Sequence, residues 1–174
     1  MIYSIIIDSN GNGIGSHAYV EEPSSYPANE APCTQAQAQN PSLYQVVNGQ
    51  VVESLAAAQS AQIALLQSSA QKAEQAPLTY TTAGGVTATF LMSPHQWTKF
   101  MGAYTKYVVK GDALPSGYSF FDQNGKSVAV TVADISGIFD AGMSQIDGAM
   151  VKLAGLIAQV EVATTVSDVQ AVTW

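Results

Sequence analysis

Charged side chains are scarce in this sequence of 174 residues, at 11% against about a quarter in an average globular protein. The net charge is −7, and lysine and arginine together number only 6. Nucleic-acid binding requires clustered cations that neutralise phosphates, and anionic membrane surfaces attract the same kind of cluster. The sequence contains no such basic run, so we expect neither nucleic acid nor a membrane as a partner.

Cysteine is also nearly absent. The single residue, Cys33, cannot form a disulfide within the chain, which predicts a reducing compartment. No apolar run approaches the length of a membrane span. The first residues, MIYSIIIDSNGNG, lack a basic stretch and become polar too early for a signal peptide, so none is expected.

Apolar residues are plentiful by contrast. They make up 47% of the chain, which is enough for a packed core and argues against wholesale disorder. The length fits one domain of ordinary size, or a small domain with an N-terminal attachment. With so few charges, the surface must be covered by Ser, Thr, Gln, Asn and Ala. The composition leaves open whether this weakly solvated surface is exposed or partly buried against another chain.

A long helix is predicted from Thr131 to about Val162. Thr131 fits the N-cap, and Asp134 fits a capping carboxylate at the positive end of the helix dipole. Apolar or small residues recur three and four positions apart, which predicts packing along the whole helix: Val132, Ile135, Phe139, Gly142, Ile146, Ala149, Leu153, Leu156 and Val160. The small residues of this seam permit either self-association or packing within the chain, and the sequence leaves both open.

The sequence of residues 1–53 predicts small β-hairpins. A short β-branched and aromatic run at 3–7 predicts a strand, the turn sequence DSNGNG follows it, and residues 14–20 fit the returning strand of a hairpin. Asn48-Gly49 separates YQVV from QVVE as in a type I′ hairpin. The glycines of the first turn resemble a nucleotide-binding loop, but the residues that follow are extended in character, so a hairpin turn is favoured.

Between these hairpins, the proline-rich residues 21–32 predict an extended linker or wrapping arm. Thr34 is predicted to cap a short helix that ends before Pro41. The core that these pieces share would be thin. We therefore expect residues 1–53 to rest on another surface, either the remainder of the chain or a partner.

The sequence of residues 54–174 predicts a helical domain with short β-hairpins. An Ala- and Gln-rich helix at 55–76 and a capped helix from Ser93 to about Lys110 precede the long helix. Hairpins are predicted at 78–92 and 118–130, and a last short helix is capped by Thr165 or Ser167. The predicted fold class is α+β, with an N-terminal β-hairpin and arm region followed by this domain and its long C-terminal helix.

No residue pattern in the sequence fits a catalytic, cofactor-binding or metal-binding site. His17 and His95 lack neighbours at the spacing of metal ligands, and Cys33 lacks a partner histidine. A glycosidase requires two carboxylates a few ångströms apart. The aspartates instead fit a turn, a helix cap or a solvated helix face: Asp122, Asp134, Asp140 and Asp147. We therefore expect no enzymatic activity and no cofactor.

Aromatic residues fall into two groups. Trp97, Phe100, Met101, Tyr104 and Val108 recur at helical spacing and are predicted to form one apolar face. This spacing favours a core role for the aromatics Trp97, Phe100 and Tyr104 over a sugar-binding stripe. The tyrosines of the N-terminal region are the better candidates for contacts with a partner protein, because the local core is thin and tyrosine is enriched at interfaces. These candidates are Tyr3, Tyr19, Tyr26 and Tyr44.

Residues 54–174 resemble the uncharacterised DUF4376 domain, which lies at the C-terminus of many tailed-phage tail and tail-fibre-associated proteins. The likeness lies in the Ala/Gln-rich helix, the hairpin LTYTTAGGVTATFLM, the helix with Trp97, and the segment FFDQNGKSVAVTVADI that leads into the last helix. The ending ATTVSDVQAVTW is similar to endings in that family. CTQAQAQNPSLYQVVNGQVVES also resembles the region that precedes the domain in small fibre-accessory proteins. The helix PHQWTKFMGAY is more aromatic than the family pattern.

The resemblance implies a non-enzymatic bacteriophage tail component, made in the host cytoplasm and located in the virion. Its expected partner is a tail-fibre or baseplate protein, and a homo-oligomer is possible. Two roles remain open. One is a structural protein that stays attached to the tail fibre or baseplate, and the other is a chaperone that binds the fibre while it folds and trimerises.

Overall fold

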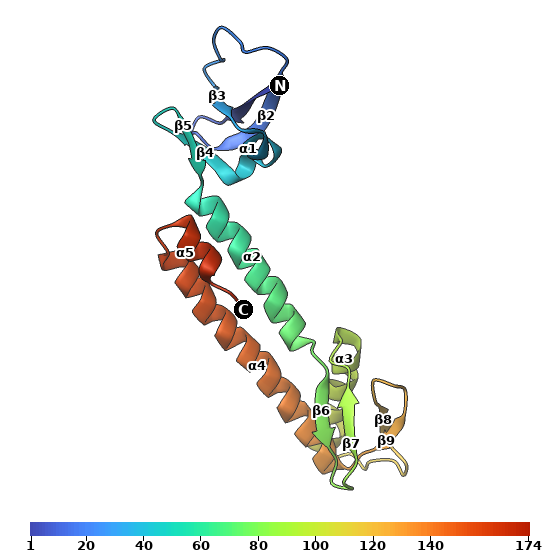
Figure 1. Cartoon of the computed structure of the whole chain (residues 1–174). Helices are drawn as coiled ribbons and strands as arrows, with labels where there is room; N and C mark the ends of the chain where they lie inside the picture. Colours follow the sequence, from blue (N-terminus) through green and yellow to red (C-terminus); the bar gives the residue numbers. More distant parts are fainter. The chain divides into compact units, whose positions relative to one another are not determined.

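The computed structural model describes residues 1–174 and has the predicted α+β class. Its contacts divide the chain into two compact units (Figure 1). Unit 1 comprises Met1–Leu66 and Leu156–Trp174, and unit 2 comprises Gln67–Gly155. The borders between them lie inside two helices, α2 (Leu55–Glu74) and α4 (Val132–Val162).

Unit 1 contains a three-stranded antiparallel sheet in which β1 (Ile2–Ile7) lies between β2 (Gly13–Tyr19) and β3 (Glu30–Cys33). The β1–β2 hairpin is confirmed. The prediction of a linker throughout residues 21–32 is wrong, because its last residues form β3. Pro32 is tolerated there because β3 is an edge strand, where a missing N–H costs no bond of the ladder.

One face of this sheet is covered by α1 (Gln35–Gln39) and by the 3-10 turn η1 (Pro41–Leu43). Thr34 caps α1 as predicted, in a reciprocal capping box. Ser16 Oγ donates to the carbonyl oxygen of an α1 residue at 2.7 Å. The buried apolar side chains of residues 1–53 are Ile5, Ala31 and Ala38, so the core of this region is thin, as expected.

The second hairpin pairs β4 (Tyr44–Val47) with β5 (Gln50–Glu53). Asn48 and Gly49 both have positive φ, at 53° and 79°, which confirms the type I′ turn. Val46 N–H donates to the carbonyl oxygen of Gly11 in the first turn at 2.8 Å, so the two hairpins are joined. The predicted boundary between residues 53 and 54 coincides with the beginning of α2 rather than with a border of the compact units.

The C-terminal segment of unit 1 is held by glutamines of α2. Gln59 Nε2 donates to the Val160 carbonyl oxygen at 3.1 Å, and Gln62 Nε2 donates to that of Val172 at 2.6 Å. Helix α5 (Val166–Ala171) lies between these anchor points in the chain and is capped by Thr165, one of its two predicted caps. Amide side chains of α2 therefore hold the C-terminal segment through hydrogen bonds to its backbone.

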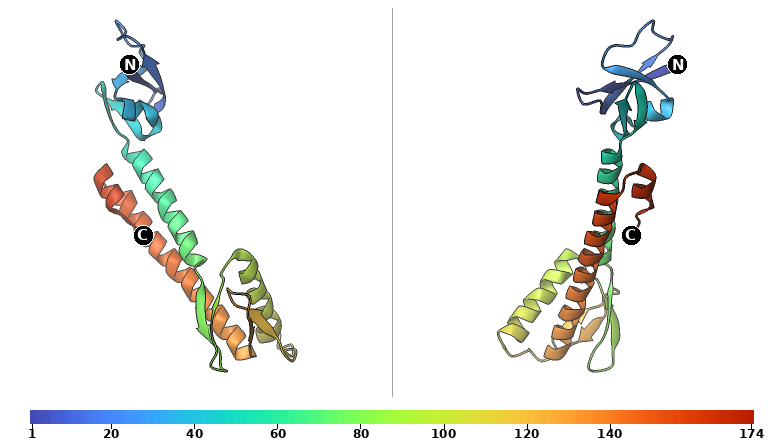
Figure 2. Two further views of the ribbon diagram at one scale, coloured as in Figure 1. Left: turned by 45° about the vertical axis from the view of Figure 1, so that its right-hand side comes forward. Right: turned by 90° about the vertical axis from the view of Figure 1, so that its left-hand side faces the viewer.

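Unit 2, whose backbone is drawn in Figure 2, has a core rich in aromatic rings. Helix α3 (Pro94–Ala103) and the N-terminal part of α4 pack with two hairpins, β6–β7 (Leu78–Thr81, Thr87–Phe90) and β8–β9 (Ser119–Phe121, Ser127–Ala129). Their shared core consists of Ala88, Phe90, Met92, Phe100, Ala103, Tyr107, Phe120, Val128, Val130, Ile135 and Ile138. Trp97 and Tyr104 stack on Phe139 of α4, so these aromatics serve the core as predicted.

The helix predicted from Ser93 to Lys110 changes type within its length. Residues after α3 form a π-helix, η2 (Tyr104–Val109), in which Lys110 N–H donates to the Thr105 carbonyl oxygen five residues earlier. The wider turn rotates the following side chains, and Tyr107 is buried although it lies outside the predicted apolar face. Met101 was predicted on that face but is 47% exposed.

Helix α4 begins with the predicted cap. Asp134 accepts hydrogen bonds from Thr131 N–H at 2.8 Å and Thr131 Oγ1 at 2.7 Å, and also from Ala83 N–H of the β6–β7 turn at 2.7 Å. Burial alone raises the pKa of Asp134, but these hydrogen bonds outweigh it and hold that pKa below its usual value. The cap therefore also fixes the β6–β7 turn to the helix. No helix is both long and apolar enough to cross a membrane.

Candidate partner-binding sites in unit 1

The sheet of unit 1 carries a polar cluster on the face opposite α1. In the strand register Ser4 pairs with His17 and Ile6 with Glu30, so these side chains share one face. Tyr19 Oη donates to the Glu30 carboxylate at 2.6 Å, and Ser4 Oγ donates to the same oxygen at 2.5 Å. His17 Nδ1 lies 2.8 Å from the other carboxylate oxygen.

The Glu30 carboxylate is therefore the hub of this cluster, and its side chain is only 4% exposed. Burial raises its pKa, but the hydrogen bonds from Ser4, Tyr19 and His17 outweigh burial and lower the pKa below its usual value. The carboxylate in turn raises the pKa of Tyr19 by accepting a hydrogen bond from its hydroxyl group.

This arrangement is unsuited to nucleophilic catalysis. In a serine triad the imidazole lies between the hydroxyl and the carboxylate and takes the hydroxyl proton. In this cluster the carboxylate lies between Ser4 and His17, and its lowered pKa keeps it ionised. What the cluster does is join the three strands, since Ser4, Tyr19 and Glu30 come from β1, β2 and β3.

We expect Tyr19→Phe to raise the pKa of Glu30, because it removes one donor to the ionised carboxylate. Since the folded pKa lies below the unfolded value near 4.5, the cluster stabilises unit 1 above about pH 4.5. That stabilisation is lost as the pH falls through the lower folded pKa. An NMR titration of the Glu30 carboxyl carbon measures the shift.

Tyr26→Phe is the matched control. The Tyr26 ring lies edge-on to Tyr19 with centroids 5.9 Å apart, but its buried hydroxyl has no hydrogen-bond partner. Its removal should leave the pKa of Glu30 unchanged. A Glu30 pKa that is insensitive to Tyr19→Phe, or that responds equally to Tyr26→Phe, would contradict this account of the cluster.

The four tyrosines nominated from the sequence do not form one surface. Tyr19 and Tyr26 lie together beside Glu30. Tyr3 lies on the opposite face of the sheet, where its hydroxyl is 3.7 Å from Met1 Sδ. Tyr44 is in the second hairpin, at a pocket of its own. Their contact with a partner stays a prediction.

The Tyr44 pocket has a volume of about 290 Å³ and is formed by the β4–β5 hairpin, α2 and α5. Leu43, Tyr44 and Leu65 supply its apolar walls, and small alanines of α2 leave the room between them. Leu43 is 42% exposed and Leu65 is 61% exposed, so apolar surface continues outside the pocket. Glu53 is its one acidic residue.

The cysteine and the aspartates that were considered as reactive residues lie in places that do not favour catalysis. Burial raises the pKa of the Cys33 thiol, which disfavours the reactive thiolate. Asp122 accepts hydrogen bonds from two backbone N–H groups of its turn, and Asp140 and Asp147 are exposed on α4. No group of three or more His, Cys, Asp or Glu side chains is arranged to hold a metal ion.

Sequence reasoning missed the Glu30 cluster and the Tyr44 pocket. Glu30 falls in the stretch predicted as a linker, and only its pairing with β1 brings it to Ser4 and His17. The pocket combines residues about 100 positions apart, such as Leu65 and Val166. The one local signal was Tyr44 itself, in a hairpin with little core of its own.

The chain matches no protein-family model, and no similar curated protein or solved structure was found. Its function is therefore inferred from its own residues and from the resemblance of residues 54–174 described above.

Proposed function

We propose that this protein is a non-enzymatic component of a bacteriophage tail, attached to the tail fibre or baseplate through unit 1. The resemblance of residues 54–174 to the DUF4376 domain supports the phage assignment. The observation that supports docking through unit 1 is the Tyr44 pocket, an open apolar pocket bordered by exposed leucines. Such pockets accept an anchoring side chain of a partner protein.

The surroundings of the pocket also favour a protein partner. Val47 and Val52 of the β4–β5 hairpin are 45% and 37% exposed. Glu53 is the one charged residue that lines the pocket, so little charge must be desolvated when a partner covers the pocket. Because the core of residues 1–53 is thin, added contacts with a partner would stabilise this region as well.

A non-enzymatic role is supported by what the reactive groups do. Hydrogen bonds from three donors keep the Glu30 carboxylate ionised. The Asp134 carboxylate accepts the hydrogen bonds of a helix cap, and burial raises the pKa of the Cys33 thiol. Each of these groups therefore has a structural task or a reduced reactivity.

The second candidate role is a chaperone that binds the fibre during folding. One feature favours it: β2 is an edge strand, with Ile14 at 65% exposure and Val20 just beyond it at 88%. An unpaired edge beside apolar side chains can accept a strand of an unfinished subunit. The two roles differ in whether the protein remains in the finished particle.

Leu65→Asp tests docking through the pocket. A charge at this exposed position of α2 should weaken binding to the fibre or baseplate protein of the same phage at least about tenfold, because the partner's anchor would have to desolvate it. Binding is measured by co-expression and quantitative pull-down with each of these phage proteins. The helix itself tolerates the change because the site faces solvent.

Val151→Asp is the matched control, since it places the same charge at a helix position that is 75% exposed and lies in unit 2. It should bind as the unaltered protein does. Equal loss of binding in both variants, or no loss in Leu65→Asp, would remove the Tyr44 pocket from the interface.

A further inference from the structure

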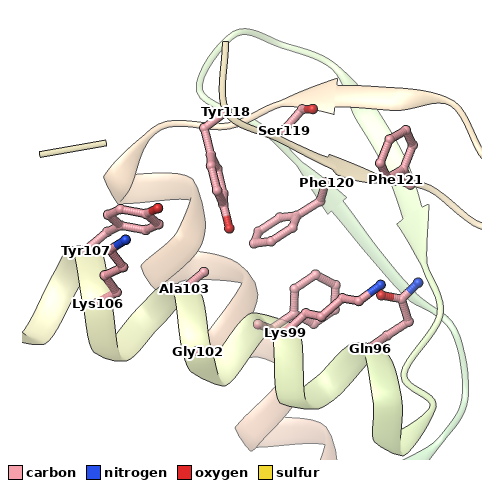
Figure 3. A pocket seen from close by; sticks show the side chains of 11 residues that line it. Gln96, Lys99, Gly102, Ala103, Lys106, Tyr107, Tyr118, Ser119, Phe120 and Phe121 are labelled. Carbon is pink, nitrogen blue, oxygen red and sulfur yellow. The ribbon is translucent and has the colours of Figure 1, made fainter. Parts of the chain in front are cut away.

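A second pocket lies in unit 2, between α3 with its π-helical extension and the strand β8. Its volume is about 380 Å³, which is within the range of small-molecule sites. Figure 3 shows Tyr118 and Phe120 projecting from the β8 side toward the helix, where Lys99, Lys106 and Tyr107 lie. Gly102 opens the helix wall, since a Cβ there would meet no atom within 4 Å.

The pocket is positively charged in an acidic protein. Lys99, Lys106 and Lys110 fall within residues 94–111, which contain no aspartate or glutamate, although the chain has only 6 lysines and arginines and a net charge of −7. Two of these lysines, Lys99 and Lys106, line the pocket together with no acidic residue. Neither of the two forms an ion pair within the chain.

The π-helix brings these groups into the pocket. Lys106 and Tyr107 are both in η2, and Lys106 Nζ lies 5.2 Å from the centroid of the Tyr107 ring. An extended π-helix is rare, is less favourable than α-helix, and is frequent at functional sites. If this segment were an ordinary α-helix, the side chains of Lys106 and Tyr107 would point in other directions than they do here.

The pocket lining combines hydrogen-bond donors with the flat faces of aromatic rings. Tyr107 and Tyr118 both line the pocket, and each carries a hydroxyl that can donate a hydrogen bond. Burial and the neighbouring Tyr107 raise the pKa of Tyr118, so its hydroxyl keeps its proton and can donate it in a hydrogen bond. Phe120 and the tyrosine rings supply flat apolar surface.

From the cavity, its two unpaired lysines and its aromatic lining, we propose that this pocket binds a small carboxylate with a flat apolar body, such as an aromatic acid. The carboxylate lies between Lys99 and Lys106 and accepts from the tyrosine hydroxyls, and the flat body packs on Phe120. The site belongs to unit 2 and is independent of docking through unit 1.

The test uses naphthoate as probe and naphthamide as its neutral counterpart, with the full-length chain and binding followed by NMR and calorimetry. Naphthoate should bind more tightly than naphthamide and should shift resonances of the pocket residues. Lys99→Gln and Lys106→Gln should each weaken naphthoate binding about five- to tenfold and leave naphthamide binding unchanged, because each removes one charged contact to the carboxylate. Added salt should weaken the binding of naphthoate alone.

Lys126→Gln is the control, because it removes the same charge from the turn between β8 and β9, outside the pocket. It should bind naphthoate as the unaltered chain does. The proposal is overturned if naphthoate does not bind at millimolar concentration, if naphthamide binds equally well, or if Lys126→Gln weakens binding as much as the pocket variants.

Discussion

Gly142→Ala is expected to lower the free energy of unfolding by about 1–3 kcal/mol, although alanine is the better helix former. Gly142 lies in α4, where the helix meets α3 and the residues that precede it. A Cβ at this position would lie 2.5 Å from Trp97 Cζ3 and 2.7 Å from Met92 Cε. The indole cannot move away freely, because it is stacked on Phe139 with centroids 5.5 Å apart.

Gly148→Ala on the same helix provides the control and should have the opposite sign. A Cβ there meets no atom within 4 Å, so only the helix propensity changes, and stability should rise by up to about 1 kcal/mol. Urea denaturation followed by tryptophan fluorescence and far-UV circular dichroism measures both. Equal signs for the two substitutions would mean that α4 does not pack on Trp97 in this way.

Gly13→Ala is expected to have a still larger effect, on the order of 3 kcal/mol, and to unfold the sheet of unit 1. A Cβ at Gly13 would lie 2.1 Å from the carbonyl oxygen of Pro41 and 2.8 Å from Ile5 Cδ1. The first obstacle is backbone, which cannot rotate away as a side chain can. Residues 1–53 bury few apolar side chains, so they have little stability with which to absorb this clash.

Gly13→Ala should unfold the sheet of unit 1 and leave unit 2 folded. Amide resonances of β1, β2 and β3 should lose their dispersion while those of α3 and β6–β7 in unit 2 are retained, and binding to the fibre or baseplate protein should be lost. Gly15→Ala, two residues along the same strand, meets only the Ile6 side chain, whose Cδ1 lies nearest at 3.3 Å, and should be tolerated. A Gly13→Ala variant whose sheet is unfolded but which still binds would contradict the role assigned to unit 1. A variant that keeps its folded sheet would contradict the close packing of Gly13 against Pro41.

The parts of the fold that were predictable are those decided locally. The cap formed by Thr131 and Asp134, the capping box of Thr34 and the Asn48-Gly49 turn each depend on residues within four positions of one another. The period of apolar residues also predicted much of the buried face of α4, including Ile135, Ala149 and Val160, although Val132 at the start of that face is 39% exposed. Local chemistry and long-range packing agree at these places, so the sequence predicts them well.

The parts that were missed depend on distant partners. Strand β3 depends on its pairing with β1, which brings Glu30 to Ser4 and Tyr19, and no local pattern around Pro27 and Pro32 predicts that pairing. The π-helix at Tyr104–Val109 changes which residues face the core, and a count at ordinary helical spacing cannot anticipate the extra residue in the turn. Both proposed sites lie at such places, the Tyr44 pocket between segments about 100 residues apart and the lysine pocket at the π-helix.

The central claim is that the protein is a structural part of a phage tail, and quantitative mass spectrometry of purified phage particles tests it most directly. The account predicts that the protein is present at a fixed multiple of the copy number of the fibre or baseplate protein. Absence from particles together with co-purification of the fibre from infected cells would establish the chaperone role instead. Absence from both would contradict the assignment to a phage tail.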